Sequence, residues 1–371
     1  MDQGAVDTRV VGATATTASI PDAAARRRRR RLAFDLTVLA VVGALLVSAL
    51  AATVGILYRE FYSPTAFVER YLGLLADGRA AEALAVPGVA VDSAELEAAG
   101  LPAVASDVLL RRDALAALTD IAIVSEVADD DVTRVTVTYR AGAFAGETTF
   151  EVERDGSTGV APTWRFAQSP LALIDLVVRG SMEFDVNGFS IDKRQVSPDG
   201  LDADPLAPLA LLVFSPGIYS VSVDTAISAT PGAAVLSDSP FQSVPVDLQA
   251  EPTDKLVSVV QERVDEFLAS CATQEVLQPT GCPFGFSVKE RLASAPDWSI
   301  AQGPAVALEP DGNGWAIPPT EAVAHIDVDI RSLFDGSVRP VSVDVPFALT
   351  AQITVLPDGT VSITVGAPEG S

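Results

Sequence analysis

The chain has 371 residues, and 49% of them are hydrophobic, so it can fill more than one globular core. Its 49 acidic residues outnumber 25 basic residues, which gives a net charge of −24. This balance argues against nucleic acid as a partner, because binding to phosphates requires a basic surface.

A run of six arginines followed by an apolar segment is the first distinctive feature. The arginines are Arg26, Arg27, Arg28, Arg29, Arg30 and Arg31. The uncharged segment covers residues 36–58, and as a helix rising about 1.5 Å per residue it reaches roughly 34 Å. The hydrocarbon core of a bilayer is about 30 Å thick. The sequence therefore predicts a transmembrane helix over residues 33–60, with residues 36–58 in contact with membrane lipid.

The arginines also predict the orientation of this helix. Cytoplasmic flanks are enriched in basic residues, and here the arginines precede the helix, whereas Arg59 and Glu60 cancel after it. The N-terminus is then cytoplasmic, with residues 1–32 as a disordered basic tail, and the later domains are extracytoplasmic. Residues 1–58 hold seven arginines and four aspartates, a net charge of +3, which leaves −27 for residues 59–371.

A cleavable signal peptide is the alternative for the same residues. Ala49-Leu50-Ala51 has the small-x-small pattern of a cleavage site. The apolar run continues past this site to Leu57, which favours retention, because the apolar part of a signal peptide is about 7–15 residues long. Both interpretations export the rest of the chain. The arginine run is explained as a topology signal and indicates no nucleic-acid partner.

Helices and then strands are predicted for residues 61–170. Ser63 and Pro64 are typical of a helix start, and further helices are predicted at 80–84 and 106–118. Strands follow where β-branched or alternating apolar residues recur. These strands are predicted at 120–127, 132–139 and 148–152, and a last one around Trp164 and Phe166 follows a turn at Asp155-Gly156.

This order makes residues 61–170 an α+β domain that resembles the NTF2-like superfamily. The resemblance rests on the helix starting at Pro64, the Ala80–Leu84 segment and the closing strand Thr163-Trp164-Arg165-Phe166. It implies helices packed into the concave face of a curved sheet. It implies no particular activity, because one fold serves many functions.

A small β domain is predicted for residues 171–252, with a tight turn at Asn187-Gly188. The pair of motifs Val186-Asn187-Gly188 and 214–219 is similar to the small β modules of TcaA-like, teicoplanin-resistance-associated envelope proteins. Those proteins also join one membrane span to β modules and an NTF2-like domain. This chain lacks their cytoplasmic cysteine-based zinc ribbon and has another module order, so the resemblance extends to architecture only.

Residues 253–371 repeat the plan of a helix followed by strands. Thr253 is typical of a helix N-cap, and apolar residues keep helical spacing up to Cys271. Strands are predicted at 298–300, 306–308 and 322–330, with two more around Asp358-Gly359. We expect a C-terminal α+β domain, and because the plan of the first module recurs, we also expect a second NTF2-like fold.

The only two cysteines, Cys271 and Cys282, lie on the predicted exported side, where thiols tend to oxidise. The sequence therefore predicts a disulfide between them. A zinc site is the alternative, but two cysteines and one distant histidine do not supply four ligands. No metal or other cofactor is predicted.

His325 is the only histidine, and strand alternation places it on one face with Asp327 and Asp329. These three residues are the candidates for chemistry. Asp327 could orient His325 as a base, and the two carboxylates could bind a cation or act as acid and base. The simpler interpretation is a strand histidine paired with a neighbouring carboxylate. No serine stands in a nucleophile elbow and no phosphate-binding glycine motif is present, so no catalytic or cofactor-binding residue is predicted.

Together these features predict a single-pass protein of a bacterial cell membrane whose extracytoplasmic domains act without catalysis. Its role would be binding, sensing or scaffolding in the cell envelope, with an envelope protein or a cell-wall component as partner. Two alternatives stay open: an exported enzyme that uses an NTF2-like cavity, and a carrier of a lipid or cell-wall precursor. A deep cavity would favour the enzyme, whereas a cavity filled by Phe and Leu side chains would disfavour it.

Overall fold

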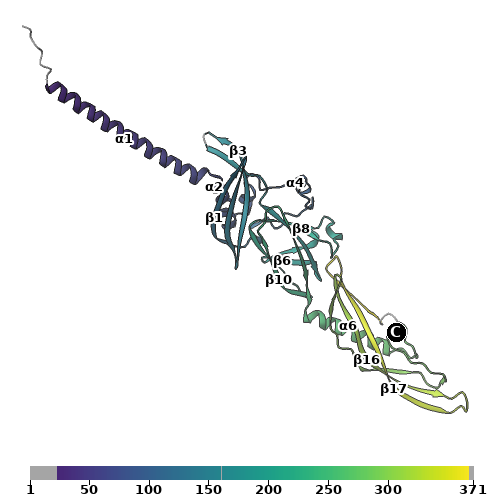
Figure 1. The fold of residues 1–371 in the computed structure, drawn as a ribbon. Coiled ribbons are helices and arrows are strands. Elements are labelled where there is room, and N and C mark those ends of the chain that lie inside the picture. Colours follow the sequence, from purple (N-terminus) through teal and green to yellow (C-terminus); the bar gives the residue numbers. More distant parts are fainter. Residues whose placement is uncertain (1–22, 160, 367–371) are drawn as a thin grey trace, which may run out of the picture. The chain divides into compact units, whose positions relative to one another are not determined.

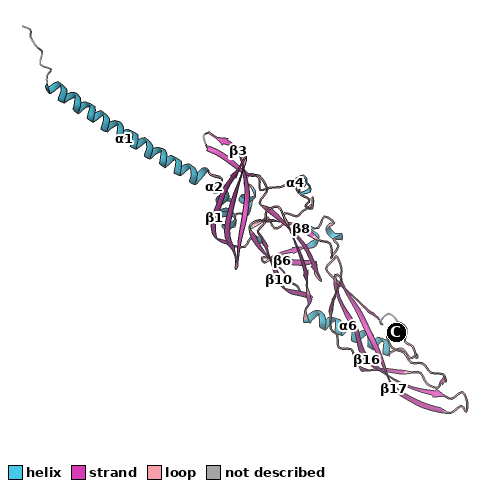
Figure 2. Cartoon of the chain, in the orientation of Figure 1, coloured by secondary structure: helices cyan, strands magenta, loops and turns pink. Residues whose placement is uncertain are grey.

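The structure is a computed structural model of the chain and describes residues 23–159 and 161–366 (Figure 1). Two units are compact by themselves, Met1–Phe61 and Tyr62–Ser371. The described part is a mixed α+β protein in which strands predominate (Figure 2). This confirms the predicted α+β class and the predicted N-terminal apolar helix.

Helix α1 (Ala23–Tyr62) has 40 residues and begins inside the segment predicted as a disordered tail. Alanine and arginine both favour the helical state, so the helix continues through the arginine run. Residues 1–22 of that predicted tail lie outside the described residues. The part Arg28–Thr53 is long and apolar enough to cross a membrane, judged by its length and composition.

Three helices follow, and side-chain caps mark the N-termini of two of them. Helix α2 (Pro64–Ala76) is capped by Ser63, whose Oγ accepts from the backbone N of Ala66 at 3.1 Å. Helix α3 (Ala80–Leu84) agrees with its prediction. Helix α4 (Ser93–Ala98) was not predicted, although the Asp92 and Glu95 side chains form a capping box at its start.

The predicted helix at 106–118 is wrong. Only a 3₁₀ turn, η1 (Arg112–Ala114), lies there. The backbone of Ser106 instead donates to the carbonyl of Ala210 at 2.8 Å and accepts from Leu212 at 2.9 Å. This segment therefore pairs with a strand about a hundred residues later, which its own sequence does not reveal.

The first sheet is antiparallel and follows chain order. Its strands are β1 (Leu118–Asp129), β2 (Val132–Ala141), β3 (Phe144–Thr158) and β4 (Ala161–Phe166). The predicted turn at Asp155-Gly156 is wrong, because β3 continues through it. Gly156 has φ +133° and lies at a register shift against β4, so the glycine allows an irregularity within the strand.

Two sheets make up the next part of the chain. One has the order β11-β5-β8 and the other β12-β10-β9-β6-β7. The first contains β5 (Leu171–Arg179), β8 (Leu209–Phe214) and β11 (Ser243–Gln249), with β11 parallel to β5. The second contains β6 (Glu183–Val186), β7 (Phe189–Asp192), β9 (Gly217–Asp224), β10 (Ser228–Ser237) and β12 (Glu251–Pro252). Two short helical turns, α5 (Lys193–Val196) and η2 (Gly200–Asp202), connect β7 to β8.

The last part joins helix α6 (Asp254–Ala272) to a six-stranded sheet. Thr253 caps the helix as predicted, because its Oγ1 accepts from the backbone N of Leu256 at 3.3 Å. The strands are β13 (Arg291–Leu292), β14 (Asp297–Gln302), β15 (Glu309–Asp311), β16 (Gly314–Arg331), β17 (Val338–Val355) and β18 (Val361–Gly366). Figure 1 shows α6 beside the long strands β16 and β17, with which it shares a core. The strand predicted at 306–308 is wrong, since Val306 N donates to the Gln261 side chain instead.

The C-terminal core also contains residues of two loops that connect strands of the preceding sheets. Met182 and Ala203 are buried in it together with Trp315 at the start of β16. The indole Nε1 of Trp315 donates to the carbonyl of Ala250 at 3.2 Å. A Cβ at Gly180 would lie 2.8 Å from Cζ2 of the same ring, so glycine permits this close approach. Trp315 therefore packs the last helix and sheet onto the strands before them.

Candidate functional site

His325 lies near the middle of β16, on the face that turns away from the core. Side chains alternate along a strand, and its neighbours Ala324 and Ile326 are buried against α6 and its surroundings. The register places His325 opposite Asp344 of β17 and opposite Ser299 of β14. The same face carries Asp327, which is paired with Ser342. We call His325, Asp327, Ser342 and Asp344 the histidine cluster.

The imidazole ring is held from two sides. Nδ1 lies 2.6 Å from Oδ1 of Asp344, and Nε2 lies 3.0 Å from Oγ of Ser342. Nε2 is also 3.5 Å from Oδ2 of Asp327. The side chain of His325 is 29% exposed and that of Asp344 is 69% exposed, so water reaches the whole cluster.

The structure brings together His325 and Asp327, as predicted, but not Asp329. Asp329 lies opposite Pro340, and its backbone N donates to the Ser294 hydroxyl at 2.8 Å. Sequence reasoning missed Ser342 and Asp344, which lie 17 and 19 residues beyond His325. The alternating pattern of β17 could have placed both on one face, but only the register with β16 brings them to His325.

Electrostatics in the cluster favour the protonated imidazole. The hydrogen bond to the Asp344 carboxylate raises the pKa of His325 above its ordinary value of 6.5, and the nearby charges of Asp327 and Asp344 act in the same direction. Partial desolvation of the ring opposes this rise. The cluster is therefore an ion pair that forms when His325 binds a proton.

The sequence of contacts Ser342–His325–Asp344 has the order of a nucleophilic triad. Acyl transfer also needs donors aimed at an oxyanion and a cavity that holds the substrate. The cluster lies on an open strand face. Cavities of about 380 and 560 Å³ in the described part of the chain are lined by other residues. The geometry thus supports proton binding and ion pairing better than nucleophilic catalysis.

No group of side chains in the described part of the chain is suited to bind a metal ion. Among residues 23–159 and 161–366, no set of three or more His, Cys, Asp or Glu side chains is arranged to hold a metal ion. Asp327 and Asp329 lie two positions apart on the same face of β16, and in the described part of the chain they belong to no such set. The carboxylate of Asp327 instead lies near Nε2 of His325, where its negative charge favours the protonated imidazole.

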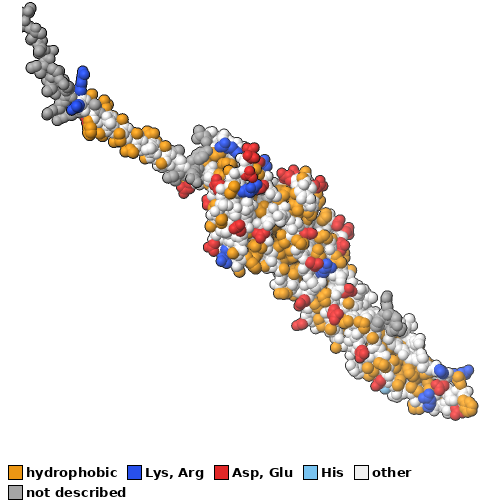
Figure 3. Space-filling model, in the orientation of Figure 1, with side chains coloured by type: hydrophobic (Ala, Val, Ile, Leu, Met, Phe, Trp, Pro, Cys, Tyr) orange, Lys and Arg blue, Asp and Glu red, His pale blue; other side chains and the backbone are white. Residues whose placement is uncertain are grey.

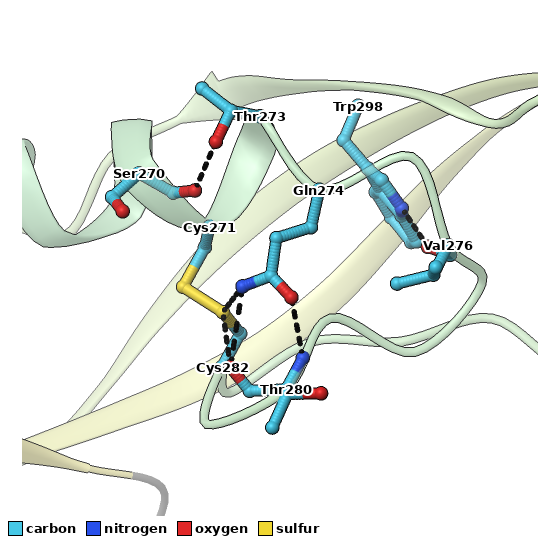
Figure 4. Close-up of a disulfide and its surroundings, with 8 residues drawn as sticks. All are labelled: Ser270, Cys271, Thr273, Gln274, Val276, Thr280, Cys282 and Trp298. Carbon is cyan, nitrogen blue, oxygen red and sulfur yellow. Dashed lines mark hydrogen bonds between the residues drawn. A yellow bond between two sulfur atoms is a disulfide. The ribbon is translucent and has the colours of Figure 1, made fainter.

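Cys271 and Cys282 form a disulfide at the end of α6 (Figure 4). The side chain of Gln274 reaches across the enclosed loop, where Oε1 accepts from Thr280 N at 2.8 Å and Nε2 donates to Thr280 O at 3.3 Å. The indole of Trp298 donates to the Val276 carbonyl at 2.8 Å. These contacts support the loop from inside, so the disulfide has a structural role and no free thiol exists among the described cysteines.

A second titratable group, Lys193, was not singled out from the sequence. Its side chain is buried, and Nζ donates to the carbonyls of Val178 and Pro205. Burial lowers the pKa of Lys193 to about 8. Because its two hydrogen bonds go to the backbone carbonyls of Val178 in β5 and of Pro205, the lysine ties the 197–208 segment to β5.

The histidine cluster predicts a pH dependence of stability. The pKa of folded His325 is raised, so its contribution is fully present below about pH 6.5 and is lost as the pH rises through the folded pKa. We expect the wild type to be more stable than Asp344→Asn at low pH. The difference between their free energies of unfolding should decrease as the pH rises over this interval. Urea unfolding of both proteins at a series of pH values measures the difference. A difference that stays constant with pH would contradict the assignment.

Asp327→Asn is the matched control for this experiment. Asp327 is farther from the ring than Asp344 and ranks below it as a cause of the shift. Its replacement should therefore reduce the pH dependence less. A larger effect from Asp327→Asn would show that Asp327, and not Asp344, is the main partner of the protonated His325.

Comparisons of the chain with protein-family models, with curated proteins and with solved structures return no match. The described residues offer one proton-binding cluster, one structural disulfide and one helix able to cross a membrane.

Proposed function

We propose that the chain is a single-pass membrane protein of the bacterial cell envelope. In this proposal α1 anchors it with the N-terminus in the cytoplasm, and residues 62–371 are outside, where they bind a partner or form a scaffold without catalysis. The observation that carries the proposal is the helix α1, whose segment Arg28–Thr53 has the length and apolar character of a membrane span. Its described apolar side chains, such as Leu39 and Val47, are exposed to the surroundings, as lipid contact requires.

Charge and oxidation state support the same placement. The arginine run precedes the apolar segment, which agrees with a cytoplasmic N-terminus. The disulfide Cys271–Cys282 suits an oxidising compartment outside the cytoplasm. The acidic excess beyond residue 58 keeps such an exterior soluble.

We propose an NTF2-like fold for residues 61–170, supported by helices packed against an antiparallel sheet. The space between α2 and the sheet is filled by the rings of Phe67, Tyr71, Phe150 and Phe166. Their centroids lie 5.0–6.1 Å apart and all four are buried. An NTF2-like enzyme needs an open cavity in this place, so the packed rings favour a binding or scaffold role over the enzyme alternative.

We also propose that the whole exterior has the modular, TcaA-like plan that its sequence resembles. Tyr71 Oη donates to the Ser215 carbonyl at 3.3 Å, and Phe214 is buried with the rings of the first sheet. Trp315 links the later sheets in a similar way. Modules joined through shared buried residues suit a scaffold, because their mutual packing resists separation.

Topology is the direct test of this proposal. Protease added to intact cells should digest residues beyond 62 and leave a membrane-bound fragment that contains α1. Mass spectrometry of that fragment distinguishes the signal-peptide alternative, in which the mature chain starts after Ala51 and no such fragment exists. A C-terminal part protected from external protease would overturn the orientation.

A variant with Arg26–Arg31 replaced by glutamine is the control for the role of the basic run. Without these charges the retention signal on the cytoplasmic side is lost. We expect a part of the molecules to insert with the opposite orientation, measured as protease-protected C-terminal domain. Insertion as before would show that other residues set the topology.

A further inference from the structure

The loop between β16 and β17, residues 332–337, exposes two large apolar side chains at its tip. Phe334 is 100% exposed and Leu333 is 66% exposed. Loops between strands are usually polar, since exposed apolar area costs free energy in water. We call residues 332–337 the tip loop. Contiguous exposed apolar surface that is rimmed by polar residues is typical of an interaction site.

The tip loop is built by its own hydrogen bonds. The Ser332 hydroxyl accepts from the backbone N of Phe334 at 3.2 Å, and Ser332 N donates to the Ser337 carbonyl at 2.9 Å. The carboxylate of Asp335 accepts from Ser337 N at 3.1 Å, so it is turned back onto the loop. The apex therefore presents Leu333 and Phe334 in a defined conformation.

A groove extends from the tip loop along the adjoining chain. It has a volume of about 560 Å³ and lies between residues 286–290 and the ends of β16 and β17. Its apolar lining residues are Phe286, Val288, Ile330, Leu333, Phe334 and Val341. Lys289 and Arg339 lie at the same groove, together with Glu290. An apolar groove with basic residues at its edge is suited to an amphiphile that has an acidic head and an apolar tail.

Basic residues gather around the tip although the exterior is strongly acidic. Four of the six lysines and arginines that follow Arg194 lie within residues 289–291 and 331–339. The same two segments contain only two carboxylates, Glu290 and Asp335. Figure 3 shows basic side chains at the end of the β16–β17 hairpin, beside exposed hydrophobic atoms and a few acidic side chains, whereas acidic side chains predominate over the rest of the visible exterior.

Arg339 pairs with Glu290, with 3.4 Å between Nη2 and Oε1, whereas the arrangement of Arg291 and Arg331 is unfavourable in the isolated protein. Arg291 and Arg331 are direct partners across β13 and β16, and like charges at such positions repel each other. Neither arginine forms an ion pair with another described residue. At physiological salt the Debye length is about 8 Å, so the distant acidic surface is largely screened. An anionic partner would relieve this local repulsion.

We propose that the tip loop and its basic flank dock on the surface of a bilayer that contains acidic lipids. Leu333 and Phe334 enter the boundary between headgroups and acyl chains, and Lys289, Arg291, Arg331 and Arg339 contact the lipid phosphates. A membrane is favoured over a folded protein partner because a fully exposed ring at a convex apex needs a surface that can yield around it. The inference rests on the proposed function, since it names the partner of the exported domains.

A capture assay with the full chain tests this proposal. The protein is reconstituted through α1 into nanodiscs of phosphatidylcholine and mixed with vesicles. These are made either of phosphatidylcholine alone or of equal parts of phosphatidylcholine and phosphatidylglycerol. Co-flotation measures the captured protein. We expect acidic vesicles to capture on the order of tenfold more protein than neutral ones, with less capture at high salt.

Two variants separate the tip loop from other exposed apolar residues. Leu333→Ser with Phe334→Ser should abolish capture, and folding is preserved because neither side chain is buried. Val124→Ser with Val127→Ser is the matched control on β1, where the side chains are 57% and 53% exposed, and capture should be unchanged. Arg291→Gln with Arg331→Gln should weaken capture by acidic vesicles.

Three outcomes would overturn the inference. They are equal capture by neutral and acidic vesicles, undiminished capture of the Leu333/Phe334 variant, and no capture at all while position 334 crosslinks to a protein. The protease experiment on intact cells tests the topology independently of the capture assay. Protease-accessible domains without capture reject only the docking, whereas capture together with a protected C-terminal part rejects the proposed function.

Discussion

Replacing Trp315 with alanine is expected to lower the free energy of unfolding by about 3–5 kcal/mol. The indole is fully buried in the core that α6 shares with β16, β17 and the loop residues Met182 and Ala203. Its removal leaves a cavity between these elements, and the rigid strands on both sides cannot collapse to fill it. Urea unfolding of the full chain in detergent, followed by far-ultraviolet circular dichroism, measures the change.

Trp315→Phe separates the cavity from the lost hydrogen bond. The Ala250 carbonyl also accepts from Gln249 Nε2 at 3.0 Å, so it keeps one donor when the indole N–H is gone. The phenylalanine variant should therefore lose much less stability than the alanine variant. Equal losses in the two variants would contradict a packing role.

Trp164→Ala is the control for a tryptophan outside this core. Its side chain is only half-buried, and its Nε1 donates to the Tyr62 carbonyl at 2.8 Å. Because less apolar surface is removed from a packed site, the loss should be smaller than for Trp315→Ala. A larger loss would show that Trp164 contributes more to stability in the first sheet than Trp315 does in the C-terminal core.

Removing the disulfide is expected to lower the free energy of unfolding by about 2–3 kcal/mol, chiefly because the unfolded chain gains conformational freedom. Cys271 and Cys282 are separated by 11 positions. Both are replaced with alanine, since serine at the buried position 271 would introduce an unpaired hydroxyl. Reductant should bring the wild type to the stability of the variant and leave the variant unchanged.

Gln274→Ala is the matched control within the same loop. It removes the hydrogen bonds to Thr280 and keeps the covalent link. Each such bond contributes about 0.5–1.5 kcal/mol, so the variant should lose less than the disulfide variant and remain sensitive to reductant. Full stability of the wild type in reductant would show that the hydrogen bonds, not the disulfide, hold the loop.

Local signals predicted much of the fold because they act over a few residues. Ser63 and Thr253 cap the helices that follow them, and Asn187-Gly188 turns between β6 and β7. The capping box of Asp92 and Glu95 was equally local and could have identified α4. Segment 106–118 misled the prediction because its partner Leu211 lies far away in the sequence.

The candidate site was only half predictable for the same reason. Alternation along one strand placed His325 and Asp327 on a common face, and that needs no knowledge of the sheet. Ser342 and Asp344 reach His325 only through the register of β16 with β17. A shift of one residue would have turned both side chains to the opposite face.

The sequence by itself determined the apolar segment within α1, the α+β class and the positions of most helices and strands. Each of these depends on composition or on a period that repeats within one element. Only the tertiary structure decided the parallel pairing of β5 with β11, the place of Trp315 in a shared core and the basic tip around Phe334. The physical reason is that pairing and packing of distant segments are selected by competition among all possible partners, which no single stretch of sequence contains.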